Sequence, residues 1–219
     1  MSIKELNSIY AFGYGLCIYS PGTLNEWMKE KKCRAKKMLS YLDKHKDMFL
    51  EMIAKGIALP IYQIPTYQYS IYITTEKDVN IPEDWEQVYL YKDCFLTIGT
   101  DDKLCFSSFE FFEEHRDLIA KSQCVFMGEV FDINDNPHSF YHSDEIQMPK
   151  GNYRFDIYGL KRKLPFSETD RENCNRNYAY LFAFRKVNNN SNENLERCDN
   201  DTHIFSIEEY LKEVHNKER

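Results

Sequence analysis

Glycine is scarce in this sequence, with eight in 219 residues, and that scarcity excludes several familiar sites. A phosphate-binding loop needs several glycines just before a helix, so that backbone N–H groups converge on the anion. Gly13-Tyr14-Gly15 is the nearest approach, but it lacks the third glycine and the Lys-Ser/Thr pair. The Gly-x-Ser-x-Gly turn of serine hydrolases is also absent. We therefore expect a protein that is not an enzyme and that needs no cofactor.

Long apolar runs and paired cysteine motifs are missing as well. No stretch approaches the roughly 18 apolar residues that span a bilayer, so we expect no membrane association. The seven cysteines are scattered, odd in number and never spaced as C-x-x-C. This spacing favours reduced, buried thiols over a disulfide framework or a zinc knuckle, and it predicts a cytoplasmic protein.

Basic residues are outnumbered, 28 against 35 acidic, which gives a net charge of -7. Direct binding of nucleic acid is therefore not expected, because phosphate contacts need a surplus of Lys and Arg. The acid is concentrated in residues 76–145, where seventeen acidic and five basic residues give a net charge of -12. Such a field raises the rate of encounter with a basic partner.

The hydrophobic pattern predicts an α+β fold with a mainly antiparallel β-sheet. Apolar residues recur at helical spacing from Leu24 to Ile53, which predicts one long N-terminal helix. A short helix is predicted from Ser107 to Ala120, and a C-terminal helix begins at Ser206. Strand patterns cover residues 69–75, 88–91, 95–98, 104–106, 125–131, 153–158 and 178–186.

We predict a single domain over residues 1–219. A Pro-x-x-x-Tyr-x-apolar-x-Ile pattern occurs at both Pro65 and Pro149, which leaves open two similar β-rich halves at about 57–122 and 123–219.

One group of residues has the composition of a metal site. His138 and His142 lie four residues apart, and Asp144 and Glu145 follow them. Such a set binds a divalent ion when a helix presents it on one face. Pro137 and the intervening Ser139-Phe140-Tyr141 favour a loop or strand instead, so we expect no metal site here.

The acidic segment supplies the predicted partner-binding residues. Trp85 offers an aromatic anchor of the kind found at protein interfaces. The alternative is that the carboxylates serve only solubility and that Trp85 belongs to the core. The predicted set is Glu83, Asp84, Trp85, Glu86, Asp101, Asp102, Glu110, Glu113, Glu114 and Asp117.

Two segments, Met148 to Tyr158 and Tyr69 to Ile73, resemble the β-rich immunity proteins and nuclease inhibitors of bacterial toxin systems. The resemblance implies a non-catalytic binding protein that neutralises a toxin, in some cases a nuclease, by covering its active site. The partner is then a basic protein. Two alternatives remain at this point: a phage or bacterial defence-related factor that binds a nucleotide or a host protein, and a metal-dependent hydrolase that uses His138, His142, Asp144 and Glu145.

Overall fold

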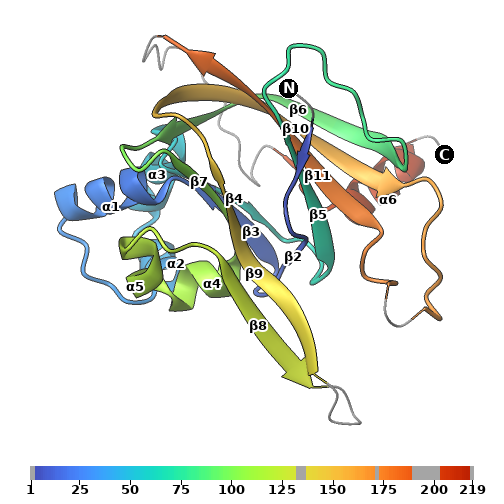
Figure 1. Cartoon of the computed structure of the whole chain (residues 1–219), viewed down its shortest axis with the longest axis horizontal. Coiled ribbons are helices and arrows are strands. Elements are labelled where there is room, and N and C mark those ends of the chain that lie inside the picture. The colour runs from blue at the N-terminus through green and yellow to red at the C-terminus, as the bar shows by residue number, and fades with distance from the viewer. Residues whose placement is uncertain (1–2, 132–136, 171–172, 189–202, 218–219) are drawn as a thin grey trace.

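The computed structural model describes residues 3–131, 137–170, 173–188 and 203–217 (Figure 1). The strands are β1 (Lys4–Glu5), β2 (Ile9–Tyr10), β3 (Gly15–Tyr19), β4 (Ala58–Tyr62), β5 (Gln68–Thr74), β6 (Trp85–Ile98), β7 (Lys103–Ser108), β8 (Phe126–Phe131), β9 (Pro137–Gln147), β10 (Gly151–Arg162) and β11 (Tyr178–Val187). The helices are α1 (Pro21–Glu30), α2 (Met38–Lys44), α3 (Lys46–Ala54), α4 (Phe109–Glu114), α5 (Arg116–Ala120) and α6 (Ile207–Lys217).

The strands form one mixed sheet in the order β4-β3-β7-β9-β2-β5-β11-β10-β6, with β1 paired to β5 and β8 to β9. The β2–β9 and β5–β11 pairs are parallel, and the other pairs are antiparallel. Strands from the two predicted halves are interleaved, since β5 pairs with β11 and β6 with β10. The predicted α+β fold with a mainly antiparallel sheet is confirmed.

The sheet curls until it is nearly closed. Its two end strands approach each other where the Thr97 N–H of β6 donates to the carbonyl of Gly56, just before β4, at 2.8 Å. Phe106 of β7 and Phe182 of β11 meet in the interior, with ring centroids 5.1 Å apart. Alternation along each strand sends one set of side chains into this interior. The core therefore lies inside a barrel-like sheet.

Helices cover two outer faces of the sheet. Helices α1 to α5 gather on one side, and α6 lies on the other (Figure 1). Tyr19 of β3 packs edge-on against Phe112 of α4, with ring centroids 5.2 Å apart. The segment before α6 is fixed by the hydroxyls of Tyr89 and Tyr180, which both donate to the Phe205 carbonyl at 2.6 and 3.0 Å.

The prediction of one long N-terminal helix is wrong. The segment forms three helices, because five of residues 31–37 are Lys or Arg, and like charges three and four residues apart destabilise a helix. Lys32, two residues after the end of α1, has a φ of 53°, and His45 separates α2 from α3. The apolar periodicity persists because each helix buries apolar residues, those of α1 and α3 against the sheet and those of α2 against α3 and α4. None of the described helices is long and apolar enough to cross a membrane.

Two further boundaries differ from the sequence prediction. The helix predicted from Ser107 begins after Ser108, whose hydroxyl accepts the Phe111 N–H at 3.1 Å, and it divides at His115. The strands predicted at 88–91 and 95–98 are one strand, β6. Asp93 has a φ of 60° within it, beside a register shift against β10, so the chain passes the irregularity without leaving the sheet.

The prediction of reduced thiols holds for five cysteines, Cys17, Cys33, Cys105, Cys124 and Cys174, which are free. It is wrong for Cys94, which is disulfide-bonded.

Candidate partner-binding surface

The predicted acidic residues lie in two separate regions. Glu83–Glu86 surround the start of β6, whereas Asp101 and Asp102 form the turn after its end. A strand of 14 residues separates them, and its 13 steps of about 3.3 Å make a path of roughly 43 Å along the chain. The α4–α5 residues adjoin the turn, because the hydroxyl of Ser122, just after α5, donates to Asp101 at 3.0 Å.

The group at the start of β6 is largely compensated by basic residues of β10. Asp84 pairs with Arg162 at 3.7 Å, and Glu86 pairs with Lys161 at 3.6 Å. Trp85 is only 3% exposed, and the Arg162 guanidinium lies 4.8 Å from the centroid of its ring. The structure therefore places Trp85 in the core, and it does not present the ring to a partner.

Asp101 organises the turn rather than facing solvent freely. Its carboxylate accepts hydrogen bonds from the Gly22 N–H at 2.8 Å and from the hydroxyls of Ser20 and Ser122 at 3.2 and 3.0 Å. Gly22 lies in the first turn of α1, whose N–H groups have no partner within the helix. Asp101 thus caps α1, while Asp102 stays exposed beside it.

Two of the α4 carboxylates are also committed within the protein. Glu113 accepts the backbone N–H groups of Leu39 and Ser40, at 2.6 and 3.3 Å, at the start of α2. Glu114 pairs with Lys37 at 2.9 Å and raises the pKa of that ammonium group. Both side chains join α4 to α2.

Glu110 and Asp117 are different. Both residues are exposed, and within the described part of the chain their carboxylates make no hydrogen bond or ion pair. Their charge is therefore available to a partner.

A strand with exposed apolar residues lies against α4, the helix that carries Glu110. Helix α5, which carries Asp117, follows α4 directly. Phe126 of β8 packs against Phe111 and His115 of α4, with ring centroids 5.5 and 4.5 Å apart, so β8 lies against that helix. Val125 and Met127, on either side of Phe126, face outward and are 55% and 53% exposed. We call Glu110, Asp117, Val125 and Met127 the α4–β8 surface. Sequence reasoning predicted the strand but did not single out Val125 and Met127 as binding residues. A signal was present, because apolar side chains occur on both faces of the predicted strand at 125–131.

An aromatic cluster supports this surface from behind. His142 of β9 lies between the rings of Phe12, Phe126 and Phe140, at centroid distances of 5.1, 5.5 and 4.9 Å. Burial lowers the pKa of His142, while the charge of Glu110 acts in the opposite direction. The neutral imidazole therefore serves as one more packed ring.

The four residues of the alternative metal site are not brought together. His142 and Glu145 lie on opposite faces of β9, because side chains alternate along a strand. Asp144 accepts from the backbone and side chain of Asn7 at 3.0 Å, and His138 is exposed farther along the hairpin. Glu145 pairs instead with a lysine of β7.

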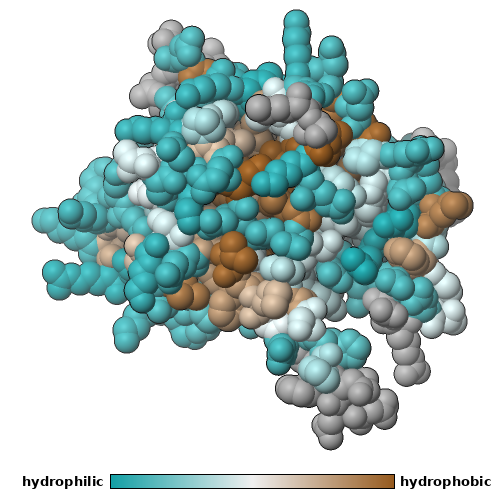
Figure 2. Space-filling model, in the orientation of Figure 1, coloured by the Kyte–Doolittle hydropathy of each residue, from teal (hydrophilic) through white to brown (hydrophobic). Residues whose placement is uncertain are grey.

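A concave region lies near the N-terminal strand, β1. It is a groove of about 1180 Å³ whose floor includes Ile73, Ile146 and Phe184, and whose rim carries basic residues. Figure 2 shows apolar surface across the middle of this face, bordered by hydrophilic side chains. Those basic residues are Lys4, Lys77, Arg185 and Lys186, with Glu5 as the single acidic one.

No known protein family matches the chain. No curated protein matches it in sequence either. Two solved structures are similar to it. ComJ from Bacillus subtilis, an inhibitor of the DNA-degrading activity of NucA, is 11% identical, with 85% of this chain and 96% of ComJ covered and a TM-score of 0.36. The crocagin biosynthetic gene J protein is 7% identical, with 84% and 98% covered and a TM-score of 0.37.

Proposed function

We propose that this chain is a non-catalytic inhibitor that binds a basic protein toxin through the α4–β8 surface. The observations that carry the proposal are the exposed, unpaired carboxylates of Glu110 on α4 and Asp117 on α5, and the exposed side chains of Val125 and Met127 on either side of Phe126, which packs against α4. Protein interfaces combine an apolar centre with a polar rim, and Met is enriched in them. A strand backed by packed rings offers such a centre in a preorganised form, which lowers the entropic cost of binding.

The class of partner follows from the sign of the charge. An enzyme that cleaves nucleic acid holds a polyanion, so its active cleft carries a surplus of Lys and Arg. Carboxylates on α4 and α5 are attracted to such a cleft, and the exposed apolar residues then displace water from its rim. Inhibition follows from covering the cleft. ComJ inhibits a DNA-degrading activity, and we propose a target of the same class for this chain on the basis of its own surface.

The test is co-expression of the chain with the products of genes that neighbour its own. Protection of cells from one of these products, together with co-purification of the two proteins, is the expected result. Failure of both, with the chain folded and abundant, would contradict the proposal.

Matched variants then locate the surface. Reversal of both charges, Glu110→Lys with Asp117→Lys, is expected to slow association by about tenfold at low salt, and by less at high salt, because salt screens steering. Met127→Asp is expected to speed dissociation, since it places a charge in the apolar centre. Glu209→Lys is the control: Glu209 is exposed on α6, on another side of the molecule (Figure 1).

The groove supports a second candidate, the binding of an anionic small molecule such as a nucleotide. Lys4 and Lys77 are exposed on its rim, and the Lys186 Nζ lies 6.0 Å from the centroid of the Tyr153 ring. A thermal-shift screen with nucleotides tests this candidate, because a ligand that binds only the folded form raises Tm. A nucleotide that raises the Tm of the protein, but not that of the Lys77→Glu variant, would favour nucleotide binding over inhibition of a toxin.

A further inference from the structure

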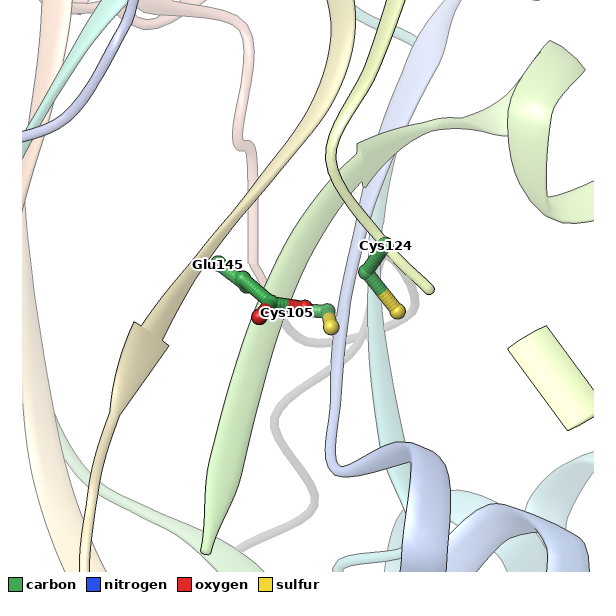
Figure 3. Close-up of side chains that lie close together, drawn as sticks. All are labelled: Cys105, Cys124 and Glu145. Carbon is green, nitrogen blue, oxygen red and sulfur yellow. The ribbon is translucent and has the colours of Figure 1, made fainter. Parts of the chain in front are cut away.

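Three side chains with metal-binding atoms face one another on the side of the sheet that α4 covers. They are Cys105 of β7, Glu145 of β9 and Cys124, which lies two residues before β8 (Figure 3). The two sulfur atoms and a carboxylate oxygen all lie within 4.8 Å of one another. Within the described residues, this is the one group of three or more such side chains at ligand spacing.

The sheet register brings these residues together. Cys105 lies directly opposite Tyr19 of β3 on one side and Glu145 of β9 on the other, so the three side chains form one row on the same face. The connection from α5 carries Cys124 over this row, and the Ser143 hydroxyl holds it there by donating to the Cys124 carbonyl. The Tyr19 hydroxyl lies 3.9 Å from the Cys124 sulfur.

The carboxylate of Glu145 lacks one partner. Its Oε1 pairs with the Lys103 ammonium group at 2.7 Å, whereas Oε2 is buried with no hydrogen-bond partner among the described residues. A buried, unsatisfied carboxylate oxygen costs free energy, and native structures avoid it unless a water or an ion supplies the partner. A cation between Oε2 and the two sulfurs supplies that partner.

Charge balance favours a divalent ion. Two thiolates and one carboxylate carry three negative charges, which a divalent ion and the adjacent Lys103 together neutralise. A neutral assembly suits this position, because both cysteines are buried and an uncompensated charge there is costly. Thiolate and carboxylate ligands together are typical of zinc.

We propose that Cys105, Cys124 and Glu145 bind one divalent ion of the zinc class. Zinc bonds of about 2.3 Å to sulfur and about 2.1 Å to oxygen place tetrahedral ligand atoms roughly 3.5–3.8 Å apart. Small side-chain movements therefore bring the three ligand atoms to the spacing of a zinc site. Three protein ligands leave the fourth position for a water. The ion joins β7, β9 and the start of β8, and so anchors the hairpin that carries the α4–β8 surface.

Titration of the reduced, metal-free protein with Co²⁺ tests the site directly. We expect one Co²⁺ per chain, with visible bands of a tetrahedral ion and thiolate-to-cobalt charge transfer, and displacement by Zn²⁺. Binding releases protons, because the two cysteines bind the ion as thiolates. The affinity is therefore expected to fall as pH is lowered.

Three variants separate the ligands from the rest of the protein. Cys105→Ser and Cys124→Ser should each abolish the charge-transfer band, and Glu145→Gln should keep the band while weakening Co²⁺ binding by at least about tenfold. Cys33→Ser is the control, because Cys33 is buried and free but lies outside the group. Glu145→Gln preserves size and shape, so it serves if either cysteine variant fails to fold.

Two results would overturn the proposal. One is the absence of Co²⁺ and Zn²⁺ binding to folded protein whose free thiols are shown to be reduced. The other is Co²⁺ binding that none of the three ligand variants changes.

Discussion

Asp101 is predicted to matter for folding rather than for partner binding. Its carboxylate accepts three hydrogen bonds, from Gly22, Ser20 and Ser122, which join α1, the β6–β7 turn and the end of α5. Asp101→Ala leaves all three donors without this acceptor. Hydrogen bonds to a charged group contribute about 1.5–3 kcal/mol, and water reaches this half-exposed site, so we expect a total loss of about 2–3 kcal/mol.

Urea unfolding measures this loss. With an m value of about 2–3 kcal/mol/M, the midpoint should fall by about 1 M without a change in slope. In a chain of this size, Tm should fall by about 5–10 °C. Asp101→Asn, which keeps one acceptor oxygen, should lose roughly half as much.

Asp117→Ala is the matched control for Asp101→Ala. Asp117 is exposed and makes no ion pair or hydrogen bond with the described residues, so its replacement should change stability by no more than about 0.5 kcal/mol. Equal stability of the Asp101→Ala and Asp117→Ala proteins would refute the reasoning, because it would mean that the three hydrogen bonds contribute nothing.

Two further predictions concern other contacts. Glu51 accepts Lys31 and Lys55, each at 2.7 Å, and these hydrogen bonds lower its pKa from 4.5 to about 2. A carboxyl whose pKa is lowered in the folded state stabilises the fold at pH values above its unfolded pKa. This contribution should therefore be lost as the pH falls from about 4.5 to about 2. In a plot of the urea midpoint against pH, Glu51→Gln should reduce the slope over that range. Tyr72→Phe leaves the buried Trp85 Nε1–H without the acceptor that it now has at 3.0 Å, and calorimetry should show a loss of about 1–3 kcal/mol.

Local patterns predicted β5 to β8, β10 and β11, but they missed β1 to β4 and β9. Residues 69–75, 125–131 and 178–186 correspond closely to β5, β8 and β11 because each carries a dense run of β-branched or aromatic residues. The division of the helical segment from Leu24 into three helices was not predicted. Apolar spacing indicates which face of a helix is buried, but it does not indicate whether the helix is continuous. The break after α1 falls at residues 31–37, where repulsion between the Lys and Arg side chains destabilises a helix.

The candidate sites depended on contacts that composition does not encode. The acidic segment looks uniform in sequence, yet Asp101 and Glu113 accept hydrogen bonds within the protein, and Asp117 makes none. Similarly, Cys105 and Cys124 lie 19 residues apart with no motif spacing, and only the pairing of β7 with β9 places Glu145 beside them. Each depends on tertiary register, which a single sequence leaves open.

The position of β5 in the sheet bears on how the chain is made. This strand lies between β2, near the N-terminus, and β11, which ends at Val187. A ribosome must therefore deliver almost the whole chain before the middle of the sheet is complete. Until then β5 presents an unpaired edge, and such edges recruit other strands. We expect nascent chains that stop before Tyr178 to depend on chaperones and to aggregate when released.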